Sequence, residues 1–141
     1  MDLALAYAEH GVSVVPLQRH NKVPPKELGG WEQYKTQQPT TEQITKWFGN
    51  RNDLVVALVC GDFIVADADT PEAVAWADKN LPVTPFKVAT GKGVHYYYNN
   101  PENFTTYVAK RTAEGDPAKL IDIRGAGGLI IAPHNIHANG N

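Results

Sequence analysis

Hydrophobic and polar positions alternate along the chain in short segments that glycine, proline or polar residues separate. Three of these segments predict helices. The alanine-rich opening, residues 3–11, ends in a His-Gly pair, which is typical of a helix that closes on glycine. Thr40 and Gln43 have the spacing of a capping box before apolar residues at helical intervals. Thr70 followed by Pro71 predicts the start of a third helix that runs to Asn80.

Seven apolar runs predict strands: Val12–Leu17, Leu54–Cys60, Phe63–Asp69, Phe86–Thr90, Val94–Tyr98, Leu120–Arg124 and Leu129–Pro133. The last six form three successive pairs around glycine-containing turns, namely Gly61-Asp62, Gly91-Lys92-Gly93 and residues 125–128, and each pair is predicted to be antiparallel neighbours. Residues 18–39, with their prolines and glycines, predict a surface loop. The expected fold is α+β, a mostly antiparallel sheet with about three helices packed on it.

Composition narrows the kind of protein. A chain of 141 residues that is 43% hydrophobic predicts one domain, residues 1–141. The net charge of −2 means that any binding of nucleic acid has to come from a local basic patch. The lone Cys60 indicates a reducing, cytoplasmic compartment, and the chain contains no apolar run long enough to cross a bilayer, so no membrane partner is expected.

Two aspartates at the end of one predicted strand carry the first candidate chemistry. Side chains alternate along a strand, so Asp67 and Asp69 point the same way. Two like charges in one small space are costly unless a hard divalent cation such as Mg²⁺ or Mn²⁺ neutralises them. The alternative is that Asp69 helps to cap the following helix and Asp67 is a solvated strand end.

A third carboxylate, Asp122, lies in another predicted strand, where alternation places Leu120, Asp122 and Arg124 on one face. Three carboxylates on one sheet surface have the ligands for two metal ions that clamp a phosphoryl displacement. The alternative is a surface pair of Asp122 and Arg124, which contributes little.

His95 follows a glycine-rich turn that carries Lys92, and it shares a strand face with Tyr97. Gly91 and Gly93 permit close approach of a phosphate, with which Lys92 and His95 can pair. A lone histidine in a strand is more often structural, so the second glycine-rich turn after Asp122 is what favours a site. His134 and His137 have metal-site spacing but lack a second pair of ligands, and no structural zinc site is predicted.

In this order the motifs resemble the bifunctional DNA primase/polymerase N-terminal domain of the archaeo-eukaryotic primase superfamily, found in phage, plasmid and mobile-element replication proteins. The matching segments are Gly11–Pro16, Lys22-x-Pro24, Asp67–Asp69, Thr90–His95, Asp122–Gly128 and Ile131–Pro133. Superfamily members often have serine where this chain has Gly93, and many have Pro-Ser where His134-Asn135 stand. Relatives commonly continue beyond the equivalent of Asn141, so the chain is expected to be a fragment of a larger replication protein.

The resemblance implies a primase-type catalytic fold related to RNA-recognition modules. It implies that the three aspartates hold Mg²⁺ or Mn²⁺ and that His95, Lys92, Arg124 and the turn glycines contact the incoming triphosphate. The expected partners are a single-stranded DNA template, NTP or dNTP, and a fused or associated helicase, in a bacterial or archaeal host cytoplasm and encoded by a phage or plasmid. Two alternatives remain open: a catalytically silent module that binds nucleic acid or a partner, and a metal-dependent nuclease.

Overall fold

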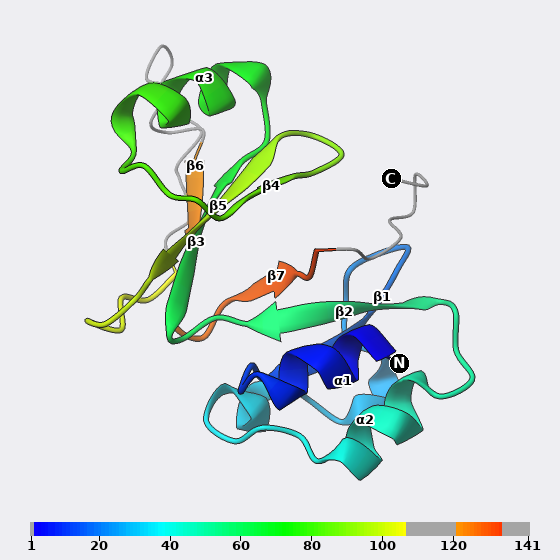
Figure 1. The fold of residues 1–141 in the computed structure, drawn as a ribbon. Coiled ribbons are helices and arrows are strands. Elements are labelled where there is room, and N and C mark those ends of the chain that lie inside the picture. The colour runs from blue at the N-terminus through cyan, green and yellow to red at the C-terminus, as the bar shows by residue number, and fades with distance from the viewer. Residues whose placement is uncertain (1, 107–120, 134–141) are drawn as a thin grey trace. The chain divides into compact units, whose positions relative to one another are not determined.

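The computed structural model describes residues 2–106 and 121–133 (Figure 1). The chain divides into two compact units. Unit 1 comprises residues 1–59 and 129–141, and unit 2 comprises residues 60–128. Each unit has its own antiparallel sheet, so the α+β class with helices packed on antiparallel strands is confirmed. His134 and His137 lie outside the described residues.

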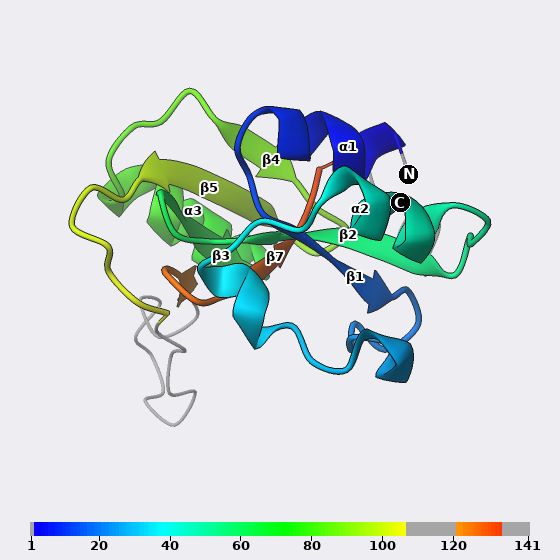
Figure 2. The same cartoon turned by 90° about the horizontal axis from the view of Figure 1, so that it is seen from below.

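Unit 1 contains a three-stranded sheet with the order β1-β2-β7. Its elements are α1 (Asp2–Glu9), β1 (Val14–Gln18), η1 (Lys26–Leu28), η2 (Glu32–Lys35), α2 (Thr41–Phe48), β2 (Leu54–Val59) and β7 (Leu129–Ile131). The two α-helices lie side by side and pack on β1 (Figure 2). The central strand β2 is buried along its whole length, which explains why it reads as a continuous apolar run rather than an alternating one.

The ends of the unit 1 helices follow their sequence signals. Thr40 accepts a hydrogen bond from the backbone N–H of Gln43, whose side chain accepts one from the backbone of Thr40, so the predicted capping box is present. After α1, Gly11 adopts a φ of 83°, a left-handed conformation that glycine tolerates without strain. The predicted loop 18–39 holds the two short 3₁₀ helices, and Tyr34 of η2 is buried in the core.

Unit 2 contains a four-stranded sheet with the order β4-β5-β3-β6. Its elements are β3 (Phe63–Ala68), α3 (Pro71–Asn80), β4 (Lys87–Ala89), β5 (Val94–Asn99) and β6 (Ile121–Arg124). In this sheet β3 and β5 are the two central strands, and β4 and β6 are the edge strands. Helix α3 covers one face of this sheet through small residues: Ala73 and Ala77 pack in a core with Ala66 and Tyr96.

Two of the three predicted hairpins are wrong. The strands on either side of Gly61-Asp62 belong to different sheets, because β2 pairs with β1 and β7 whereas β3 pairs with β5 and β6. The same holds on either side of residues 125–128. Instead of closing hairpins, the two connections bond to each other: Cys60 N–H donates to Gly128 O, and Gly127 N–H donates to Cys60 O. The hairpin of β4 and β5 is confirmed.

Candidate metal and nucleotide site

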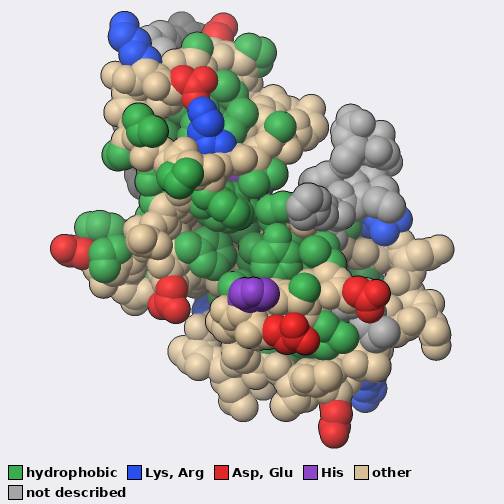
Figure 3. Space-filling model, in the orientation of Figure 1, with side chains coloured by type: hydrophobic (Ala, Val, Ile, Leu, Met, Phe, Trp, Pro, Cys, Tyr) green, Lys and Arg blue, Asp and Glu red, His purple; other side chains and the backbone are tan. Residues whose placement is uncertain are grey.

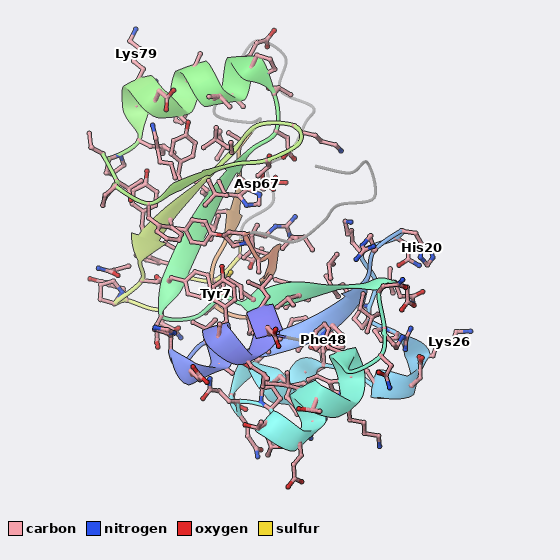
Figure 4. The ribbon with its side chains drawn as sticks, turned by 45° about the vertical axis from the view of Figure 1, so that its right-hand side comes forward. Tyr7, His20, Lys26, Phe48, Asp67 and Lys79 are labelled. Atoms are coloured by element: carbon pink, nitrogen blue, oxygen red, sulfur yellow. The ribbon has the colours of Figure 1, made fainter. Side chains whose placement is uncertain are left out.

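A row of polar side chains crosses the middle of the unit 2 sheet. Asp67 of β3 lies directly opposite His95 of β5 on one side and Asp122 of β6 on the other. Residues that are directly opposite in antiparallel strands point to the same face, so the three side chains are neighbours. Figure 4 shows Asp67 on β3. Because α3 packs against Ala66 and Ala68, the row occupies the opposite face of the sheet.

Asp67 is the centre of this row and is largely shielded from water. Its side chain is 13% exposed, and His95, with its side chain 12% exposed, places Nε2 3.3 Å from Asp67 Oδ1. That oxygen is buried, and within the described residues no well-aligned hydrogen bond meets it. A buried acceptor in this state is destabilising, and a cation or hydrogen-bond donor beside Asp67 would relieve that cost.

Asp69 follows the end of β3 and interacts with Asp67. Burial and the neighbouring Asp67 carboxylate raise the pKa of Asp69 to about 6. Burial also acts to raise the pKa of Asp67, but contacts from His95 and Asp69, with the charges of His95 and Arg124, outweigh it and hold that pKa below its usual range. The N-cap of α3 is Thr70, whose side chain accepts the hydrogen bond from the Ala73 N–H.

Asp122 is buried rather than a surface residue, with 7% of its area exposed. Ile121 enters the core beneath α3, so the predicted alternation in β6 holds and Asp122 faces the row. Arg124 Nη2 lies 3.9 Å from Asp122 Oδ2. Arg124 lies two residues after Asp122 on the same face of β6. Its positive charge also acts to lower the pKa of Asp67.

The turn between β4 and β5 brings Lys92 to the acids. Thr90 N–H donates to Gly93 O, and Gly93 N–H donates to Thr90 Oγ1, which fixes the turn. Lys92 is exposed, and its charge acts to lower the pKa of Asp69. Gly91 lies in the exposed part of the turn.

Gly93 has a structural role that the sequence did not reveal. A Cβ at this position would overlap the carbonyl oxygen of Ala68 and lie 3.2 Å from Asp69 Cα. The turn therefore passes so close to the end of β3 that glycine is required. A close approach between backbones gives no periodic signal in the sequence.

The donor set fits a hard divalent cation. Carboxylate oxygens are the ligands that Mg²⁺ and Mn²⁺ prefer, and the unsatisfied Oδ1 of Asp67 lies among them. In residues 2–106 and 121–133, no three histidine, cysteine or acidic side chains are already assembled at metal-binding spacing. Binding of one ion by Asp67, Asp69 and Asp122 together therefore requires their side chains to converge, which neutralisation of their mutual repulsion favours.

The fold and the row define an α+β domain that displays an acidic site, flanked by histidine, lysine and arginine, on the sheet face opposite its helix. The model of the family described as bifunctional DNA primase/polymerase, N-terminal, matches residues 4–141. The chain belongs to this family, whose chemistry is primase- and polymerase-type nucleotidyl transfer in DNA replication. No curated protein matches the chain. In the part of the chain that the structure describes, no helix has the length and apolar character to span a membrane.

Proposed function

We propose that the chain is a template-directed nucleotidyltransferase that adds nucleotides from NTP or dNTP to a primer or an initiating nucleotide on single-stranded DNA. The observation that carries this proposal is the row of His95, Asp67 and Asp122 across three strands, with Asp69 beside it. It combines acids suited to metal ions with cationic side chains suited to phosphates. Family membership supports the same class of chemistry.

Each residue of the row has a role in this proposal. Asp67, Asp69 and Asp122 would hold Mg²⁺ or Mn²⁺, which when bound supplies Lewis-acid stabilisation of the attacking and leaving oxygens. His95 and Lys92 would orient the triphosphate and offset its charge, and Arg124 would assist. Asp67, His95 and Asp122 lie on paired strands of one sheet, so a modest convergence of the acids on a metal ion would complete the site beside the nucleotide.

The charge distribution argues against a silent binding module. Three acids clustered on one face repel a polyanion and would weaken binding of nucleic acid unless a cation occupies the site. A metal-dependent nuclease needs the same acids but does not need cations placed for a triphosphate. The His95 side chain, 3.3 Å from Asp67, and the charge of Lys92, which acts on Asp69, support the polymerase over the nuclease.

The test is primer extension in Mn²⁺ by the wild-type chain and by Asp67→Asn. Loss of a metal ligand that acts in the transition state removes several kcal/mol, so we expect incorporation to fall by at least roughly 100-fold with the fold intact. Asp78→Asn is the matched control, because Asp78 bonds to Tyr96 and Lys87 on the other face of the same sheet. Equal extension by Asp67→Asn and wild type would refute the assignment.

A second measurement separates the alternatives. Labelled single-stranded DNA is incubated with metal in two parallel reactions, one without nucleotide and one with nucleotide. Degradation that depends on Asp67 would support the nuclease. Nucleotide incorporation with intact template would support the polymerase, and neither activity in a protein that still binds DNA would support the silent module.

A further inference from the structure

Cationic side chains gather in unit 1 at the turn after β1. Arg19, His20 and Lys22 lie in this turn, and Lys26 begins η1 a few residues later. We call these four residues the basic turn. His20, Lys22 and Lys26 are exposed, and in Figure 4 the labelled His20 and Lys26 point away from the strands of unit 1. On the face that Figure 3 shows, described Lys and Arg side chains are otherwise scattered among acidic ones.

The basic turn is held by its own hydrogen bonds. Gln18 N–H donates to Val23 O, and Lys22 N–H donates to Gln18 O, which closes the turn. Asn21 accepts from Val23 N–H, and Arg19 N–H donates to Asp53 O at the start of β2. Lys22 adopts a φ of 59°, a left-handed conformation that is uncommon for lysine. A turn with this many bonds presents its side chains in a fixed arrangement rather than as a flexible arm.

The charges in this turn are not balanced. Lys22 Nζ donates to the backbone oxygen of Arg19 at 2.6 Å, so two cations share one short stretch of chain. The Nε of Arg19 is buried, and in the described part of the chain no hydrogen bond meets it. No ion pair there joins Arg19, Lys22 or Lys26 to a carboxylate. The two nearby acids, Glu27 and Asp53, are both engaged by Arg51, at 2.8 and 2.6 Å.

Neighbouring like charges and a buried unsatisfied donor are both unfavourable in the free protein. Bound phosphate oxygens relieve the repulsion between the cations, because they pair with the exposed lysines. Several exposed cations spread over a turn and an adjoining helix fit a chain of phosphates better than one compact anion.

We propose that the basic turn binds consecutive backbone phosphates of single-stranded DNA and supplies the local patch that a chain of net charge −2 needs for its template. This inference rests on the proposed function for its partner, but it concerns residues outside the acidic row.

The experiment measures how the affinity for a fluorescently labelled oligothymidylate depends on salt. The variant Lys22→Asn combined with Lys26→Gln removes two charges, and asparagine tolerates the left-handed conformation at position 22. Each lost phosphate contact reduces the magnitude of the slope of log K against log salt by about 0.7. Between roughly 50 and 200 mM salt we therefore expect the magnitude of the slope to be smaller by about 1.4 in the double variant. Lys46→Gln, on the exposed side of α2, is the matched control and should leave the slope unchanged.

The outcomes are distinguishable. An unchanged salt dependence in the double variant would overturn the inference, and the basic turn would then serve an acidic protein or no partner. An equal decrease of the salt dependence in Lys46→Gln would also overturn it. A lower slope in the double variant, with Mn²⁺-dependent nucleotide affinity equal to wild type, would support it. The proposed function fails separately, if the wild-type chain binds the oligonucleotide through the basic turn but incorporates no nucleotide.

Discussion

Replacing Gly93 by alanine should damage both the stability of unit 2 and its acidic site. The added Cβ would overlap the Ala68 carbonyl oxygen, and it would lie 2.8 Å from the Ala68 carbonyl carbon and 3.2 Å from Asp69 Cα. All three are backbone atoms, so no side-chain rotation can relieve the clash. Either β5 or the end of β3 has to move.

The size of the effect follows from what that movement disturbs. Forcing extra volume into a packed site typically costs about 1–3 kcal/mol. The adjacent Ala68–Val94 pair and the hydrogen bond from Gly93 N–H to Thr90 Oγ1 are strained by the same shift. We therefore expect a loss of about 2 kcal/mol and a Tm lower by roughly 6–10 °C for a chain of this size. Because Asp69 moves with Ala68, Mn²⁺ affinity should fall as well.

Gly61→Ala is the matched control, since a Cβ there has no atom within 4 Å. Thermal denaturation followed by circular dichroism gives the stability, and calorimetric titration with Mn²⁺ gives the metal affinity. If Gly93→Ala matched Gly61→Ala in Tm and in metal affinity, the close approach of the two backbones would not be what requires glycine at position 93.

Two further predictions concern the acidic row. His95→Ala should weaken triphosphate binding by about 1.5–3 kcal/mol, the value of a hydrogen bond to a charged group, while oligonucleotide affinity stays unchanged; equal nucleotide affinity in calorimetry would remove His95 from the site. Asp69 has a pKa of about 6 against an ordinary 3.8, so its contribution to metal-free stability is present at low pH and is lost as pH rises to about 6. Mn²⁺ competes with the proton on Asp69, so its affinity should rise with pH up to about 6 and then level off. Asp69→Asn should abolish this dependence, and a flat wild-type titration would contradict the raised pKa of Asp69.

Features of the fold that depend on neighbouring residues were predictable. The capping box at Thr40, the Thr70-Pro71 helix start and the hairpin of β4 and β5 each follow from local rules. Alternation was sufficient to place the Asp67 side chain away from the core beneath α3, and likewise Asp122 in β6.

Features that depend on pairing between strands distant in the sequence were not predictable. Glycine-containing turns between two apolar runs predict hairpins, but Gly61 and residues 125–128 carry the chain from one sheet to another. The sequence gives no direct sign of this, because a crossover and a tight turn use the same flexible residues. The pairing of Asp67 with Asp122 is a result of this crossover, so alternation predicted their faces but not their adjacency.

The basic turn was not predicted from the sequence, for a similar reason. Lys22 and Lys26 were visible in a loop that appeared irregular, and the net charge gave no reason to single them out. The hydrogen bonds that close residues 18–23 and the capture of Glu27 and Asp53 by Arg51 are what leave the cations unbalanced. Neither these hydrogen bonds nor these ion pairs produce a repeating pattern in the sequence.

The net charge of −2 conceals two opposite local excesses, and we propose a different ligand for each. In unit 2, the clustered acids raise the pKa of Asp69 and leave a buried oxygen of Asp67 unsatisfied. In unit 1, Arg19 and Lys22 share a turn and leave a buried nitrogen unsatisfied. Selection for stability alone would remove both arrangements, since each is unfavourable in the free protein. We propose that a cation relieves the first and that phosphates offset the cations of the second, which are the two ligands that a nucleotidyltransferase working on a DNA template would bind.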